Sequence, residues 1–260
     1  LQADEQRDLF ALFTRSAREF LDGWFESTPI KAVLGFDSIV GHFASPDTPG
    51  SAYVLLHHVF GQVNGVKGAW GHAIGGMGAI TQAMARACAA AGVSIGLEER
   101  VARVNVAGGK AVGVTLADGR TLEAPIIASN AGPALLFRQL VDRSDLPADF
   151  ARAIDGYAAG SGTFRMNVAL SELPRFTVLP EAGPHHGAGI IIAPSLDYMD
   201  RAFTDAKTHG WSRAPIVEML IPSTLDDTLA PPGQHVASLF CQQFAPSLPN
   251  GQSWDDARDT

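Results

Sequence analysis

The stretch GVKGAWGHAIGGMGAITQAMARACAAAG, residues 65–92, decides the fold, because a glycine-dense loop leads directly into a helix of small residues. From Ile80 onward apolar residues recur at the spacing of one helix face, which predicts a helix ending near Gly92. The turn at Gly75, Gly76 and Met77 then lies at a helix N-terminus, where free N–H groups favour an anion or a ring edge. A loop packed closely against a neighbouring strand is the alternative, and the loop itself does not decide between the two.

Two common nucleotide-binding motifs do not occur in this sequence. A dinucleotide fingerprint needs G-x-G-x-x-G directly after a buried strand, whereas here the glycine spacings are wider and residues 53–63 carry two histidines and a glutamine. The phosphate loop G-x-x-x-x-G-K-[ST] is also missing. The sequence therefore excludes a self-contained Rossmann or P-loop site in this chain.

A β-meander follows the helix. Strand-like runs at residues 101–106, 112–116 and 121–128 are joined by Gly-Gly and Asp-Gly turns, which are strong hairpin signals. The last run leads through Ser129, Asn130 and Ala131 into an apolar helix. Small residues after a strand are a common place for ligand phosphates, although a plain strand-to-helix turn has the same pattern.

The regions before the glycine loop and after the meander predict a second layer or domain. The N-terminal residues 4–25 form an amphipathic helical pattern rich in aromatics that we expect to face the core, and residues 30–36 predict a short helix. Residues 52–60 fit either a helix or a buried strand. The C-terminal part predicts a mixed sheet with one helix on it, from strand-like runs at 163–171, 188–193, 215–221 and 236–244 and a helical pattern at 195–208.

Composition limits the partners. The chain has 260 residues, 46% of them hydrophobic, so it can bury a large core. Its net charge is −8, and it lacks the clustered Lys and Arg residues that bind nucleic acid or an anionic membrane. No apolar run approaches the ~20 residues of a transmembrane segment. Cys88 and Cys241 are too far apart in sequence for a CxxC pair, and reduced thiols in the cytoplasm are the expectation. The sequence leaves open whether copies of the chain form a homo-oligomer.

The sequence gives little support for a metal site, a serine nucleophile or a catalytic pair of carboxylates. Adjacent histidines such as His185 and His186 point in different directions on a strand or helix, so we expect no metal site. The only serine between nearby glycines, Ser161, does not form G-x-S-x-G. The carboxylate pairs Glu98-Glu99, Asp226-Asp227 and Asp255-Asp256 are predicted to lie at the surface.

The sequence resembles a known family along nearly its whole length. The ordered segments that carry the resemblance are Trp24-Phe25-Glu26-Ser27, Ser45-Pro46-Asp47-Thr48-Pro49-Gly50, Leu55-Leu56-His57-His58, Gly68-Ala69-Trp70-Gly71, Gly75-Gly76-Met77-Gly78-Ala79, the meander into Ser129-Asn130, and Ala230-Pro231-Pro232-Gly233. Together they are similar to phytoene dehydrogenase-like FAD-dependent oxidoreductases. In that family three regions assemble the flavin site, and this chain resembles only the central one. The start at Leu1 and the helix-like end at residues 254–260 likewise suggest a fragment of a longer protein.

The resemblance implies an α/β (α+β mixed) fold with three parts. Residues 1–64 would be the helical part of a substrate domain, residues 65–135 the central part of a FAD/NAD(P)-binding-type domain, and residues 136–260 the mixed-sheet substrate domain. It implies FAD in the intact protein, and it gives no support for NAD(P). The cofactor contacts that it implies are Val101, Ser129, Asn130 and Ala131, and the residues on the substrate side are Gly75, Gly76, Met77, His57 and His58.

Two functions follow as hypotheses. The first is a fragment of a FAD-dependent oxidoreductase, inactive by itself, that moves hydride from an apolar small-molecule substrate to flavin. The second is a non-catalytic binding or interaction module that keeps the fold without the cofactor. No residue has a motif that identifies it as a catalytic acid or base, so the catalytic residues are not assigned.

Overall fold

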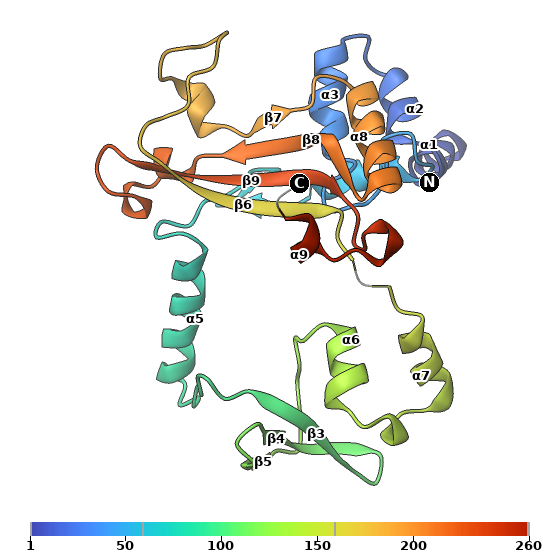
Figure 1. The fold of residues 1–260 in the computed structure, drawn as a ribbon, viewed down its shortest axis with the longest axis vertical. Coiled ribbons are helices and arrows are strands. Elements are labelled where there is room, and N and C mark those ends of the chain that lie inside the picture. The colour runs from blue at the N-terminus through green and yellow to red at the C-terminus, as the bar shows by residue number, and fades with distance from the viewer. Residues whose placement is uncertain (1, 59, 159, 259–260) are drawn as a thin grey trace. The chain divides into compact units, whose positions relative to one another are not determined.

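The computed structural model describes residues 2–58, 60–158 and 160–258, which form two compact units (Figure 1). The larger unit contains residues 1–82 and 160–260, and the smaller unit contains residues 83–159. The helix α5 (Met77–Ala90) begins in the larger unit and ends in the smaller one. The division at residues 64 and 135 concerns function and stays a prediction.

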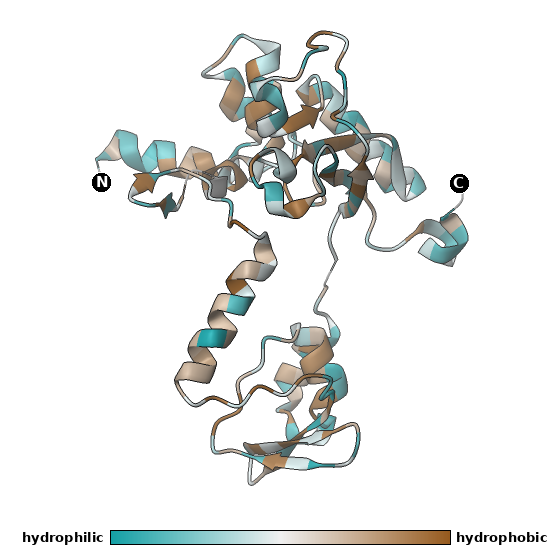
Figure 2. Ribbon diagram, turned by 90° about the vertical axis from the view of Figure 1, so that its left-hand side faces the viewer, coloured by the Kyte–Doolittle hydropathy of each residue, from teal (hydrophilic) through white to brown (hydrophobic). Residues whose placement is uncertain are grey.

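A four-stranded antiparallel sheet forms the centre of the larger unit, in the order β6-β9-β8-β7. Long runs of β-branched and aromatic residues favour these strands, and Figure 2 shows much of the sheet in the brown of hydrophobic residues. All four predicted strands are present. Their bounds are β6 Thr163–Leu170, β7 Ile190–Ile192, β8 Trp211–Leu220 and β9 His235–Phe244.

Helices α3 (Thr28–Phe36) and α8 (Leu196–His209) cover one face of this sheet. The predicted helix α8 begins where the Ser195 hydroxyl accepts a hydrogen bond from the Tyr198 N–H, and it ends at Gly210 with φ 99°. Burial of each large apolar side chain here stabilises the fold by about 1.5–3 kcal/mol. The core residues are Ala32, Phe36, Ile39, Ala193, Leu196, Met199, Ala202 and Ile216.

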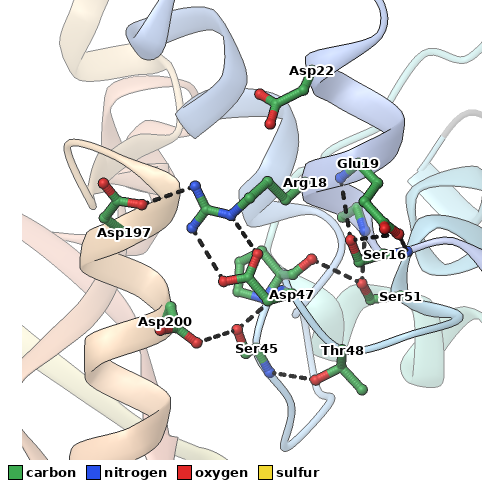
Figure 3. A network of polar contacts seen from close by, with 12 residues as sticks. Ser16, Arg18, Glu19, Asp22, Ser45, Asp47, Thr48, Ser51, Asp197 and Asp200 are labelled. Atoms are coloured by element: carbon green, nitrogen blue, oxygen red, sulfur yellow. Dashed lines mark hydrogen bonds and ion pairs between the residues drawn. The ribbon is translucent and has the colours of Figure 1, made fainter.

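A polar network joins the N-terminal helices to α8 (Figure 3). The Arg18 guanidinium, on helix α2 (Ala17–Asp22), pairs with Asp47 and lies 2.8 Å from Asp197 of α8. The Ser45 hydroxyl donates to Asp200 of α8 over 2.7 Å. The Ser-Pro-Asp-Thr-Pro-Gly segment that carried part of the family resemblance is therefore a clamp between helices.

The N-terminal region differs from the single core-facing helix that we predicted. Helix α1 (Ala3–Thr14) has no buried residue, and Phe10 is 70% exposed. The chain then turns, and α2 starts at Ser16, whose side chain forms a capping box with Glu19. The undecided segment is helical, with α4 (Ser51–Val54) followed by a 3₁₀ turn (Leu55–His58).

The smaller unit contains the predicted meander, formed by β3 (Val101–Ala107), β4 (Lys110–Leu116) and β5 (Thr121–Glu123). The prediction of a strand through residue 128 was wrong, because residues 125–130 make no backbone hydrogen bonds within the described chain. The next helix is shorter than an ordinary one, with α6 (Pro133–Leu135) continuing into a π-helical turn (Leu136–Leu140).

One helix of the smaller unit was not predicted from the sequence. In the smaller unit, α7 (Ala148–Asp155) has its C-terminal carbonyls bound by Arg138, which donates to the carbonyl of Ile154. Helix α5 was predicted, but its apolar face is exposed rather than buried: Ile80 is 45% and Met84 62% exposed, and Cys88 is half-buried. No helix in the described ranges is long and apolar enough to cross a membrane.

Candidate functional site

The glycine loop lies at the start of α5, as predicted. A short hairpin, β1 (Gln62–Val63) with β2 (Val66–Lys67), precedes it. Gly75 and Gly76 have φ 84° and 73°, a left-handed conformation in which a Cβ atom is strained. Met77 begins the helix and is 79% exposed. These residues therefore form a sharp, fixed turn with an accessible apolar side chain beside it.

A buried carboxylate holds this turn. The Oδ2 atom of Asp226 accepts a hydrogen bond of 2.7 Å from the Gly75 N–H and lies 3.4 Å from Nε2 of His72. Its Oδ1 atom accepts from both the N–H and the hydroxyl of Thr228. Asp226 is only 3% exposed, so the prediction of a surface carboxylate at this position was wrong.

The electrostatics of Asp226 follow from these contacts. The hydroxyl of Thr228 is the strongest influence, and together with the N–H groups of Gly75 and Thr228 it lowers the pKa of Asp226 to about 2 against the opposing effect of burial. The carboxylate is therefore ionised near neutral pH. Packing also restricts this turn. A Cβ atom on Gly76 would lie 3.3 Å from Cδ2 of Leu229, so a side chain at this position would crowd Leu229.

The face of the large sheet opposite α3 and α8 is almost entirely apolar. Alternate residues of a strand point to opposite faces, and directly paired residues share a face. The pairings Phe164 with Cys241 and Cys241 with Val217 thus place three apolar side chains in one row, opposite the helix-covered face of Ile216. We call this surface the apolar sheet face; it consists of Phe164, Met166, Val168, Ile190, Ile192, Val217, Met219, Ala237, Leu239 and Cys241.

Solvent reaches this face at its two edges. Phe164 and Met166 on the edge strand β6 are each 44% exposed, and Ile192 on the opposite edge strand is 48% exposed. Cys241 lies at the centre and is buried, which raises the pKa of its thiol and keeps it protonated. The thiol thus contributes an apolar surface rather than a nucleophile.

The apolar sheet face ends in a polar pair. Continuing the same register, Leu170 pairs with His235, whose Nδ1 lies 3.2 Å from the Ser223 hydroxyl oxygen. That oxygen also accepts a hydrogen bond from the Val236 N–H. The donor between the Ser223 hydroxyl and Nδ1 of His235 depends on the tautomer of the ring, and in either tautomer the hydrogen bond holds the ring in one orientation. The spacing of Ser223 and His235 in sequence gave no sign of this contact.

The expected cofactor residues belong to the smaller unit. Val101 begins β3 and is half-buried, whereas Ser129 and Asn130 are exposed, and the Ser129 hydroxyl accepts from the Ala131 N–H over 3.2 Å. Small side chains and a backbone without hydrogen-bond partners at residues 125–130 fit a segment that approaches a phosphate or a ring edge. The roles of these four residues stay predictions.

The histidines singled out in the sequence have different outcomes. The side chains of His57 and His58 lie outside the described part of the structure, so their expected place on the substrate side stays a prediction. His186 is buried: its Nδ1 accepts from the Gly183 N–H, which leaves the proton on Nε2, 2.9 Å from the Pro174 carbonyl. It has a structural role. Among the described residues no group of three or more potential ligands could hold a metal ion.

The chain is similar to proteins that are named as oxidoreductases or desaturases. It is 41% identical over 254 residues to the mouse protein named pyridine nucleotide-disulfide oxidoreductase domain-containing protein 2, an alignment that spans 95% of this chain and 44% of that protein. A phytoene desaturase from Cercospora nicotianae is 25% identical over 226 residues, which is 86% of this chain and 32% of that protein. No protein family model matches the sequence.

Solved structures agree on the fold. The crystal structure of an oxidoreductase from Methanosarcina mazei superposes with a TM-score of 0.60 at 20% identity and covers 89% of this chain and 48% of that one. The shared fold mixes helices with antiparallel sheets, which confirms the predicted fold class. The chain spans less than half the length of each of these three proteins.

Proposed function

We propose that this chain, which is related to oxidoreductases of the pyridine nucleotide-disulfide and phytoene desaturase kind, is the substrate-holding part and the central cofactor-contacting part of a FAD-dependent oxidoreductase. The observation that carries the proposal is the apolar sheet face, a continuous surface that is open at both edges. Along strand β6, the distance from Phe164 to Leu170 is roughly 20 Å at ~3.3 Å per residue. An elongated apolar molecule would bury its length against it.

The cofactor would contact the smaller unit. Val101 and the backbone of Ser129, Asn130 and Ala131 would hold FAD at its adenine and diphosphate portions. The side chains at residues 129–131 are small, and the backbone of residues 125–130 makes no backbone hydrogen bonds within the described chain, so a phosphate could approach it. When bound, FAD supplies the hydride acceptor for a substrate C–H bond. NAD(P) has no corresponding support in this chain.

The residues of the chain itself would bind and orient the substrate. The apolar sheet face would exclude water from an apolar substrate, and the hydrophobic effect would favour binding by about 25 cal/mol for each Å² buried. Gly75, Gly76 and Met77 would border the substrate, held in one conformation by Asp226. His57 and His58 would line the same side.

The first test is FAD binding, measured by flavin absorbance and fluorescence quenching. The 260-residue chain would be compared with a version extended at both ends into its natural reading frame. Binding by the extended form alone supports a site assembled from several regions of a longer chain. Absence of binding by both forms contradicts the flavoenzyme and favours a non-catalytic module.

A second test addresses the substrate surface. The substitution Met166→Asp puts a charge on the apolar sheet face, whereas Asn167→Asp puts the same charge on the opposite face of the same exposed strand. We expect the first to weaken binding of hexadecanoate at least tenfold and the second to change it less than about twofold. Equal effects of the two substitutions would contradict the assignment of this surface.

A further inference from the structure

A cavity of about 580 Å³ lies at the end of the large sheet where β6 begins and β9 ends. Its walls include Phe164 of β6, Trp211 of β8, Phe244 of β9 and Trp254 of the short helix α9 (Trp254–Ala257). This volume is within the range of small-molecule sites, which is ~300–1,000 Å³. We call it the aromatic cavity.

The four rings form one connected series. The ring centroids of Phe164 and Phe244 are 5.4 Å apart, and Trp254 lies 6.0 Å from both Phe244 and Trp211. Aromatic rings at such distances attract each other and offer flat faces and edges to a further ring. A planar conjugated group is the ligand that makes most use of such walls.

The charge of the cavity wall limits which ligands the aromatic cavity can bind. An aromatic box can also bind a cation, but Arg258 lines this cavity, and its guanidinium would repel one. The ligand group should therefore be planar and neutral or anionic.

Phe164 connects this cavity to the proposed substrate surface, because it belongs to both the cavity wall and the apolar sheet face. We propose that the aromatic cavity receives a planar conjugated end group of the apolar substrate, an inference that rests on the proposed function. A molecule lying along the strands would enter the cavity with the end that passes Phe164. The cavity would then discriminate ring-terminated substrates from open-chain ones.

The test compares two ligands, 12-(1-pyrenyl)dodecanoate and hexadecanoate, on the 260-residue chain. Trp211 and Trp254 report occupancy directly, through quenching of their fluorescence and energy transfer to pyrene. Trp254→Leu and Trp211→Leu should each weaken the pyrene ligand about tenfold, because each removes a ring from the wall while the other tryptophan still reports occupancy. Hexadecanoate, followed by calorimetry, should change less than about twofold.

Two controls accompany these variants. Phe10→Leu removes a ring that is 70% exposed on α1 and should leave both ligands unchanged. Circular dichroism of each variant shows whether it is folded, and Trp211→Leu keeps the test available if Trp254→Leu disturbs α9.

The outcomes separate this inference from the proposed function. If both ligands bind and the ring substitutions affect them equally or not at all, the aromatic cavity is not a ring site, while the apolar sheet face stands. If neither ligand binds to the unsubstituted chain, the inference and the substrate surface both fail. Selective loss of the pyrene ligand supports the inference whatever the result for FAD.

Discussion

Asp226 Oδ2 accepts a hydrogen bond from the backbone of Gly75, 151 residues earlier in the chain, over 2.7 Å. Through this bond a segment next to β9 fixes the turn that begins α5. Since the proposed function puts that turn at the border of the substrate, Asp226 would act as a positioning residue. Its contribution can be measured without knowing the substrate.

The substitution Asp226→Asn should release the glycine loop. The amide keeps the size of the side chain but removes the charge that Gly75 and Thr228 stabilise, and hydrogen bonds to a charged group are stronger than neutral ones. We expect amide hydrogen exchange at Gly75 and Gly76 to accelerate about tenfold or more. Asp227→Asn, at the exposed neighbouring position, is the matched control. Unchanged exchange in both variants would show that Asp226 does not hold the loop.

The stability of the chain should depend on Asp226 in acid. Its pKa is lowered to about 2 in the folded chain, compared with ~3.9 for an unfolded chain. A lowered pKa means that the stabilisation is fully present above the unfolded value and is lost as pH falls through the folded value. The difference in unfolding free energy between the natural chain and Asp226→Asn should thus be constant above about pH 5 and shrink between about pH 4 and pH 2. Urea titrations across this range measure it, and a difference that grows toward low pH would contradict the assignment.

Alanine at two neighbouring glycines should have opposite effects. Gly76→Ala puts a Cβ atom at φ 73° and 3.3 Å from Leu229, so we expect it to destabilise the chain by about 1–2 kcal/mol. Gly78, inside α5, has no atom within 4 Å of its Cβ position. Gly78→Ala should stabilise by up to about 1 kcal/mol through helix propensity. Chemical denaturation compares the two, and the same sign for both would refute this account of the turn.

Ser51→Ala should destabilise the contact between α4 and the start of α2. Ser51 is fully buried, and its hydroxyl oxygen accepts a 2.8 Å hydrogen bond from the Ala17 N–H at the start of α2. Without it this buried N–H has no acceptor, which should lower the free energy of unfolding by about 1–3 kcal/mol. Ser144→Ala, at an exposed position, should change it by less than about 0.5 kcal/mol. A matching loss in both variants would argue against a specific role for Ser51.

Local sequence patterns predicted most helices and strands correctly but did not predict the contacts between remote segments. The strand β6 was expected at residues 163–171 and extends over Thr163–Leu170, because its run of apolar and β-branched residues has few alternatives. The break between α1 and α2 was missed, although Ser16 and Glu19 have the spacing of a capping box. That signal was readable from sequence alone.

The burial of Asp226 could not be read from its neighbours. The adjacent Asp227 and the proline-rich surroundings are typical of surface, and the glycine loop that covers Asp226 is remote in sequence. Only the threonine two residues later hinted at a turn that binds its own backbone. The apolar sheet face was hidden for a related reason: strand order depends on tertiary pairing, which strand propensity does not encode.

The division of the larger unit into residues 1–82 and 160–260 has a consequence for biosynthesis. Its core joins Phe36, made early, with Met199 and Ile216, made after the whole smaller unit has left the ribosome. Contacts between such remote segments form slowly because a long loop must close first. The smaller unit, continuous in sequence, can fold during translation, whereas α3 must wait with its apolar side exposed. Chaperones that shield nascent chains should therefore act on the first 82 residues.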